Sequence, residues 1–444
     1  ILPGKRLGDI ALRVRALGQT DWMALSTQDA GESGAYTSHI EATELTSTYT
    51  LGSGLTCKSA FVLDNNALHW QIAVENTGTE KVELGDVAIP LRGNDDYVWD
   101  AEVTSTMRVF MHSFVSCHGT FVYWLRPNSE PPYLLMTPRG STSCEYWDMS
   151  QITDGKEIVT EGYNLYLHSK AQESVIEGKG GSWRQAHTGR VLDPGETARF
   201  DFTFQWASSY QKIRDLLFSN GQFDIDVVPG MVVPQGMSVR LSVRTDGIVA
   251  LAPEYPPHTE VTLLESSGHR QIIELKFSKL GENIITLSNR LGKKTTLEFF
   301  VTESAKTMIE KRAAFLMGRS MHRDATVWWD GLVSDWNMES HTLLGPENLD
   351  RVKGWREYMA SCDDPGLGKV PFVALKNIEY PVQDEITAID YYIEHFVWGG
   401  LQMTDEESHA FGIYGIPNWK RNRESPEAGP DGKHHIWRIY DYPH

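Results

Sequence analysis

Residues 297–317 read LEFFVTESAKTMIEKRAAFLM, and the hydrophobic period changes inside this stretch. Leu297, Phe299 and Val301 alternate with other residues, which is typical of a strand with one buried face. After Thr302 the apolar residues return every three or four positions, as on one side of an amphipathic helix. Ser304 is a suitable N-cap for that helix. The predicted buried face of the helix carries Ile309, Ala313, Leu316 and Met317. The stretch therefore predicts that a β-rich region ends near residue 302 and that a helical region follows.

The chain before this change predicts two β-sandwiches. From residue 1 to about 204, short segments rich in β-branched and aromatic residues alternate with Gly, Asn, Asp and Pro. We expect a large antiparallel sandwich over 1–220, and the segment 209–218 has the pattern of a short amphipathic helix. A second series of short alternating segments predicts a smaller, immunoglobulin-like sandwich over 221–302.

The chain after residue 302 predicts helices joined by long loops. A linker helix is expected over 303–322, and a second strong helix over 384–398 ends at a double glycine. The predicted apolar stripe of the second helix consists of Ile386, Ile389, Ile393 and Val397. The loops around these helices are rich in Gly and Pro, and long loops on a helical scaffold often carry function. We therefore expect the catalytic region over 323–444.

Composition excludes several classes of protein. The 444 residues carry a net charge of −18, which disfavours nucleic acid and anionic membrane surfaces as partners. The four cysteines form neither a zinc signature nor a disulfide framework, although one pair within the first 150 residues either bridges or stays as buried thiols. His112 and His118 flank Cys117 without a fourth ligand at metal spacing, and no glycine-rich phosphate loop is present. We therefore expect no metal and no cofactor.

Aromatic and acidic residues are concentrated in the last part of the chain. Residues 328–444 hold seven of the chain's 14 tryptophans, interleaved with acidic clusters such as 405–407. Sugar rings stack on indoles, and glycosidic bonds are broken by paired carboxylic acids. This density indicates a carbohydrate site and an oligosaccharide or polysaccharide as the partner.

Three stretches resemble a known superfamily. They are 75–91 (ENTGTEKVELGDVAIPL), 112–127 (HSFVSCHGTFVYWLRP) and 398–419. Together with the order of parts, they resemble the six-hairpin glycosidases, such as bacterial glucoamylases and maltose phosphorylases. The second and third stretches, together with 183–185 (WRQ), look closer still to one uncharacterised family of bacterial and fungal glycosidase-like proteins. The resemblance implies a β-sandwich, a linker helix and then an (α/α)6 toroid.

The toroid implied by this resemblance does not fit into the chain. Twelve helices of about a dozen residues, with their connections, need roughly 200 residues. Residues 323–444 supply only 122. We therefore expect the first hairpins of an incomplete toroid, and a second fragment of the same protein as a further partner.

Three acidic positions are the candidates for catalysis. Glu385 lies at a helix start, where the dipole favours an ionised carboxylate suited to a base or nucleophile, although a capping charge is the alternative. Asp405 follows the double glycine, where a solvated loop face is the alternative. Asp441 lies between tyrosines that could tune its pKa or bind sugar hydroxyls, and a structural hydrogen bond is the alternative. The predicted substrate-binding residues are Trp398, Gln402, Tyr414, Asn418, Trp419, Arg421, Trp437, Tyr442 and His444.

These residues favour a glycoside hydrolase that uses carboxylates as general acid and base. A polysaccharide lyase is the nearest alternative: lyases on helical toroids use Tyr or His as the base and Arg or Asn to neutralise a uronate, roles that Tyr442, His444, Arg421 and Asn418 could fill. A phosphorylase and a glycan-binding protein without catalysis stay open. A polysaccharide substrate also predicts a secreted or periplasmic location.

Overall fold

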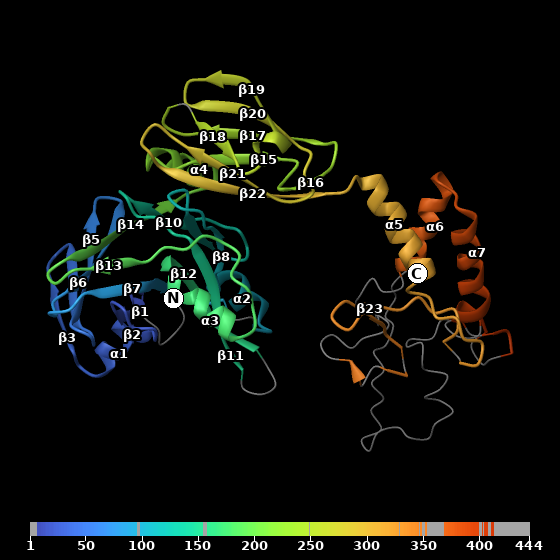
Figure 1. The fold of residues 1–444 in the computed structure, drawn as a ribbon, viewed down its shortest axis with the longest axis horizontal. Coiled ribbons are helices and arrows are strands. Elements are labelled where there is room, and N and C mark those ends of the chain that lie inside the picture. Colours follow the sequence, from blue (N-terminus) through green and yellow to red (C-terminus); the bar gives the residue numbers. More distant parts are fainter. Residues whose placement is uncertain are drawn as a thin grey trace, which may run out of the picture. The chain divides into compact units, whose positions relative to one another are not determined.

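The computed structural model describes residues 7–95, 98–153, 158–247, 249–327, 329–345, 347–348, 351–352, 368–398, 402, 404–406 and 410–412. The chain divides into two compact units, Ile1–Thr302 and Glu303–His444. Figure 1 shows the first unit in blue to yellow and the second in orange to red. The first unit is built from sheets, and the second contains mostly helices.

Two antiparallel sheets form the large sandwich of the first unit. One has the order β11 (Tyr146–Thr153), β12 (Ile158–Ser169), β7 (Val82–Leu91), β1 (Ala11–Ala16) and β2 (Met23–Ser26), with β13 (Arg190–Leu192) also paired to β7. The other has the order β3 (Tyr36–Ile40), β4 (Glu44–Thr50), β5 (Leu55–Asp64), β6 (Ala67–Asn76), β14 (Thr197–Ala207), β10 (Tyr133–Arg139), β9 (Phe121–Leu125) and β8 (Phe110–Phe114). Three short helices connect strands of the sandwich: α1 (Thr27–Glu32), α2 (Ala101–Met107) and α3 (Lys170–Gly178).

The core between these two sheets is apolar and centred on aromatic rings. Trp70 on β6 is fully buried and stacks on Phe61, with ring centroids 5.4 Å apart. Its indole N–H donates to the Ser59 hydroxyl at 2.9 Å, so the one polar atom of the ring is satisfied. Leu12 and Val14 of β1 point into this core, and Ala11 and Arg13 therefore lie on the opposite face of the sheet.

A smaller sandwich completes the first unit. Its sheets have the orders β15 (Asp224–Val228), β17 (Ser238–Arg244), β20 (Arg270–Phe277), β19 (Thr259–Ser267) and β16 (Val232–Pro234), β22 (Lys294–Thr302), β21 (Gly281–Ser288), β18 (Ala250–Pro253). A short 3-10 helix, η1 (Pro256–His258), precedes β19. Buried side chains alternate along β20, as a strand with one face in the core requires.

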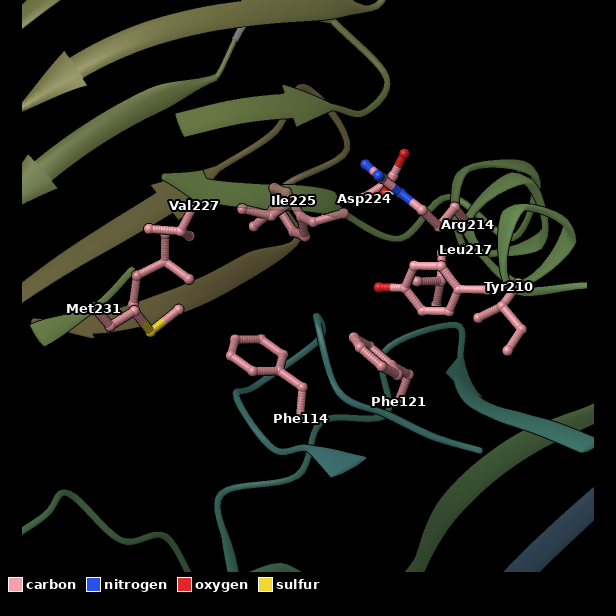
Figure 2. Close-up of a pocket in the computed structure, with 12 residues that line it drawn as sticks. Phe114, Phe121, Tyr210, Arg214, Leu217, Asp224, Ile225, Val227 and Met231 are labelled. Carbon is pink, nitrogen blue, oxygen red and sulfur yellow. Dashed lines mark hydrogen bonds and ion pairs between the residues drawn. The ribbon is translucent and has the colours of Figure 1, made fainter. Parts of the chain in front are cut away.

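Helix α4 (Tyr210–Ser219) joins the two sandwiches. Its Arg214 and the strand residue Arg244 both donate to the buried carboxylate of Asp224, at 2.7 and 2.9 Å. A cavity of about 120 Å³ lies beside this ion pair. Figure 2 shows Phe114 of β8 and Phe121 of β9 on one side of it, with Ile225 and Val227 of β15 across from them. The lining is apolar apart from the ion pair and the Tyr210 hydroxyl, so this cavity is part of the junction rather than a polar binding site.

The second unit packs helices around its own core. Its described elements are α5 (Ala305–Gly318), β23 (Trp336–Asn337), β24 (Thr342–Leu343), α6 (Lys369–Glu379), α7 (Gln383–Tyr392) and a π-helical turn, η4 (Ile393–Val397). Ala313, Leu316 and Met317 are buried as predicted. Ile309 is 42% exposed, so its assignment to the buried face is wrong.

The predicted stripe on the second helix is right in period and right in part: Ile389 and Val397 pack against the core of the unit, but the most buried positions lie one residue earlier. The buried positions are Glu385, Ala388, Tyr392 and Phe396, whereas Ile393 is 49% exposed. The helix is also not α-helical to Trp398, because it widens into the π-helical turn after Tyr392. A buried charge at Glu385 is the physical reason: an interhelical ion pair turns this residue inward.

The prediction of a multi-sheet β-sandwich chain is confirmed. The toroid and the four-part division at residues 220, 302 and 322 stay predictions. Among the described residues, no helix is long and apolar enough to cross a membrane.

Candidate active site

A loop that follows α5 in the second unit carries the charged residues of the candidate site. Within it, Gly331 donates its main-chain N–H to the carbonyl of His322 at 3.1 Å, and His322 donates in return to Leu332 at 2.8 Å. These paired bonds close the loop on itself. Arg323 and Asp330 lie between them and are therefore held by a short, hydrogen-bonded segment.

Gly331 lets this loop approach the π-helical turn. Its φ is +82°, a conformation that favours glycine. A Cβ atom at this position would lie 3.2 Å from the Cβ of His395 and 3.3 Å from that of Phe396. The close packing of the loop against η4 therefore depends on glycine here.

The carboxylate of Asp330 is the centre of a hydrogen-bonded cluster. The Tyr391 hydroxyl donates to its Oδ1 and Oδ2 at 2.9 and 2.7 Å. His395 Nδ1 lies 3.0 Å from Oδ2, and the main-chain N–H of Asp324 donates to Oδ1 at 2.8 Å. Asp330 is only 4% exposed, so its position is fixed by its partners. One buried carboxylate thus orients a phenol and an imidazole.

Two aromatic rings and one guanidinium group stack beside this carboxylate. The rings of Tyr391 and His395 are 3.8 Å apart and nearly parallel, at 12°. The guanidinium of Arg323 lies 4.1 Å from the centre of the Tyr391 ring, in cation–π geometry. The π-helical turn that carries His395 is an uncommon element, frequent at functional sites. We name Arg323, Asp330, Tyr391 and His395 the Asp330 cluster.

The contacts determine which groups carry protons. The hydrogen bond from Tyr391 to Asp330 raises the pKa of this phenol, which therefore stays protonated at neutral pH. His395 faces the carboxylate through Nδ1, so Nε2 is the ring nitrogen that Asp330 does not engage. His395 is 39% exposed, so a ligand can reach it. The cluster thus holds a proton donor, a proton acceptor and an exposed cation.

Among the residues predicted for catalysis, Glu385 lies buried between α6 and α7. Lys376 donates to its Oε2 at 2.9 Å, and the side-chain amide of Asn377 donates to the same atom at 2.7 Å. The side chains of Lys376 and Glu385 are 4% and 7% exposed. Glu385 thus takes part in a buried ion pair, and its role as base or nucleophile stays a prediction.

The structure brings together two of the predicted substrate-binding residues. Trp398 and Gln402 form an isolated bridge, and the Gln402 side chain donates to the carbonyl of Phe411 at 3.1 Å. The rings of Trp398 and Phe411 are 6.1 Å apart, and 46% of Trp398 is exposed. Asp405 is exposed in the same loop region. An aromatic surface thus follows directly after the π-helical turn.

The other predicted residues lie outside the described part of the chain. They are Tyr414, Asn418, Trp419, Arg421, Trp437, Asp441, Tyr442 and His444.

The Asp330 cluster is absent from the sequence-based predictions. Its signal is the tetrapeptide 328–331 (WWDG), which sets an acid and a glycine beside two aromatic residues. Tyr391 and His395 lay inside a predicted helix and were assigned no role. Their spacing of four places them on one helix face, where a shared partner is possible.

Fold and site together define a class: a chain of two β-sandwiches and a helical unit with an exposed Tyr–His–Arg cluster. The chain belongs to a family of unknown function, DUF5695, whose model matches residues 4–415. No curated protein sequence matches it.

Among solved structures, a polysaccharide lyase has a similar fold. The TM-score is 0.68 at 15% identity, and the match covers 92% of this chain and 55% of the lyase. The chain therefore spans just over half the length of that enzyme. A GH36 α-galactosidase from Geobacillus stearothermophilus matches at 0.25 and 11% identity, over 52% of this chain and 33% of its own. A putative aldose 1-epimerase from Escherichia coli K12 matches at 0.25 and 12%, over 39% and 68%. These last two scores establish no shared overall fold.

Proposed function

We propose that the protein is a carbohydrate-active enzyme, and that the Asp330 cluster serves a polysaccharide lyase that cleaves next to a uronate. The observation that carries this proposal is the single buried carboxylate of Asp330, which accepts from the Tyr391 hydroxyl and faces Nδ1 of the partly exposed His395. The fold shared with a polysaccharide lyase supports the same class of reaction.

The chemistry of a lyase needs one proton acceptor and one proton donor. In β-elimination, a base removes the C5 proton beside the uronate carboxylate, the C4–O bond breaks, and a C4=C5 double bond forms. Nε2 of His395 accepts the C5 proton in this scheme. The Tyr391 hydroxyl, which donates to Asp330 at rest, turns to the leaving C4 oxygen in this scheme, gives its proton there and is the general acid.

Arg323 supplies the charge that the reaction requires. Removal of the C5 proton places negative charge on the uronate carboxylate, and a guanidinium binds a carboxylate in a bidentate manner. Stacking on Tyr391 fixes the guanidinium beside the proton donor. Trp398, three residues after His395, offers an exposed indole on which a neighbouring sugar can stack.

The hydrolase predicted from the sequence is the alternative within the same class of enzymes. It needs two carboxylates on either side of the scissile bond. Glu385 is engaged by Lys376 and Asn377, so its use in catalysis would require this ion pair to open. The secreted or periplasmic location stays a prediction that fits either enzyme.

The test is the product formed by the protein purified from its native host. We expect near-ultraviolet absorbance from an unsaturated uronate when polygalacturonate, alginate, hyaluronan or glucuronoxylan is supplied, with at least one of the four cleaved. Tyr391→Phe and His395→Ala should each lower kcat by about a hundredfold or more, because each removes one proton transfer.

Tyr380→Phe is the matched control, since Tyr380 is 63% exposed and lies in the same unit outside the cluster. It should keep full activity. Saturated products with new reducing ends would refute the lyase and indicate a hydrolase. Full activity in folded Tyr391→Phe would refute the role of the Asp330 cluster.

A further inference from the structure

A polar cavity of about 280 Å³ lies in the first unit, on the face of the sheet β11–β12–β7–β1–β2 that points away from the core. Its base comes from strand residues that are small. Ala11 and Ala88 are paired directly across β1 and β7, and Ser26 and Tyr166 extend the same row on the two sides. Two adjacent alanines between larger residues leave a depression in the sheet.

One wall of the cavity is a fixed hydrogen-bond network. Asp86, 2% exposed, accepts from the Arg13 guanidinium at 2.6 Å and caps α3 through the main-chain N–H groups of Ala171 and Gln172 at 2.9 and 3.0 Å. Arg13 also donates to the side-chain carbonyl of Gln172. These bonds fix the guanidinium of Arg13, which lines the cavity.

The hydrogen-bond network continues to β11 through the carboxylate of Asp148. Asp148 accepts from Gln172 at 2.9 Å, from the Tyr166 hydroxyl at 2.9 Å and from the Asn164 amide at 2.8 Å. Asn164 and Tyr166 also line the cavity. A wall whose side chains are already ordered loses little further conformational entropy when a ligand binds.

Three further polar residues of the lining, Asp9, Ser26 and Asp29, are named the rim and set the charge. The Ser26 hydroxyl donates to Asp29 at 2.7 Å and accepts from its main-chain N–H at 3.0 Å, so this side chain too is held in place. With Asp86, the two rim aspartates make three carboxylates against the two guanidinium groups of the lining, Arg13 and Arg92. The cavity is therefore unfavourable for an anion and suited to a neutral ligand that both donates and accepts hydrogen bonds.

We infer that this cavity binds one neutral pyranose ring. The C–H face of the ring would lie on Ala11 and Ala88, and its hydroxyls would meet the polar wall and rim. The volume is just below the range of about 300–1,000 Å³ for small-molecule sites, which suits a single sugar. This inference rests on the proposed function, because an enzyme of polysaccharides gains residence time from a second attachment point.

The experiment is saturation-transfer difference NMR on the full chain with three separate probes: the methyl glycosides of glucose, galactose and mannose. Glucuronate is the charged comparison. A dozen heavy atoms predict a Kd on the order of 1 mM, within reach of this method. We expect a signal from at least one methyl hexoside. The part of this signal that a cavity-filling variant removes should be at least tenfold larger than the part removed from the glucuronate signal, because the Asp330 cluster can itself bind a uronate.

Ala24→Trp fills the cavity from the exposed position paired with Arg13, and should reduce the hexoside signal at least tenfold. Ala250→Trp, at an exposed strand position of the small sandwich, is the control and should leave the signal unchanged. If circular dichroism shows that Ala24→Trp does not fold, Gln28→Trp fills the cavity from α1 in its place.

A hexoside signal that persists in the folded cavity-filling variant overturns the inference, as does the absence of any hexoside signal. A glucuronate signal that the cavity-filling variant lowers as much as the hexoside signal also overturns it. The elimination assay reads a different signal and a different unit. Loss of turnover in Tyr391→Phe with retained hexoside binding therefore separates the two proposals.

Discussion

Replacing Glu385 with leucine tests whether this residue holds the second unit together. Its carboxylate accepts from Lys376 and Asn377 while both charged side chains are almost entirely buried. Removal of one partner leaves the Lys376 ammonium buried without a counter-charge, a change that costs about 3–5 kcal/mol in unfolding free energy. Since 1.4 kcal/mol is a factor of about ten, the helices should open at least a hundredfold more often.

Hydrogen–deuterium exchange of peptides from α6 and α7 is the suitable assay, because it reports the opening of one unit in a chain that has two. Asp384→Leu is the matched control: the residue is exposed in the same helical turn and should change stability by less than about 1 kcal/mol. The double variant Lys376→Met/Glu385→Leu removes both charges and should recover most of the loss, since buried ion pairs are often replaceable by apolar groups. Equal protection in Glu385→Leu and the wild type would refute the structural role, and lost activity without lost protection would restore Glu385 as a catalytic candidate.

Two further predictions concern the first unit. Burial alone would raise the pKa of Glu83, but hydrogen bonds from Lys170 and Arg15 outweigh it and lower this pKa below its ordinary 4.5. Because the folded-state pKa of Glu83 is depressed, its ionised carboxylate stabilises the folded protein fully above pH 4.5, and this stabilisation falls as the pH drops through the folded value. The difference in Tm between wild type and Glu83→Gln should therefore shrink below pH 4.5. A constant difference down to pH 3 would contradict this. Burial raises the pKa of the Cys57 thiol to about 12, so iodoacetamide should leave Cys57 unmodified in the native protein at pH 8 and alkylate it in urea, as peptide mass spectrometry would show; native alkylation would contradict its burial.

The β-sandwiches were predictable from the sequence because their strands follow simple local rules. The strands β20 and β22 each present alternate residues to one core, and this period of two can be read from the sequence without knowledge of the partner strand. The pairing of β1 with β7, or of β6 with β14, links segments far apart in the chain. The sequence pattern contains no information on those partners, so it predicted a sandwich and left its strand order open.

The phase error on α7 has a different origin. A hydrophobic stripe assigns every charged residue to solvent, and Glu385 breaks that rule because Lys376 neutralises it inside the interface. With Glu385 inward, the buried positions shift by one residue, and Ile393 turns outward. Local pattern therefore fails at the point where a tertiary ion pair overrides it.

The Asp330 cluster was beyond the reach of sequence for a related reason. Asp330 and Tyr391 are 61 positions apart, and nothing in the intervening chain indicates that they meet. The main-chain N–H of Asp324 donates to Oδ1, and Oδ2 accepts from the Tyr391 hydroxyl and faces Nδ1 of His395. A buried carboxylate needs such partners, but it does not require that they be a phenol and a 39% exposed imidazole beside an exposed guanidinium. Burial of Asp330 costs free energy that burial of an apolar residue would not. In a proton-transfer site this cost is explained, because the buried carboxylate positions the groups that exchange protons.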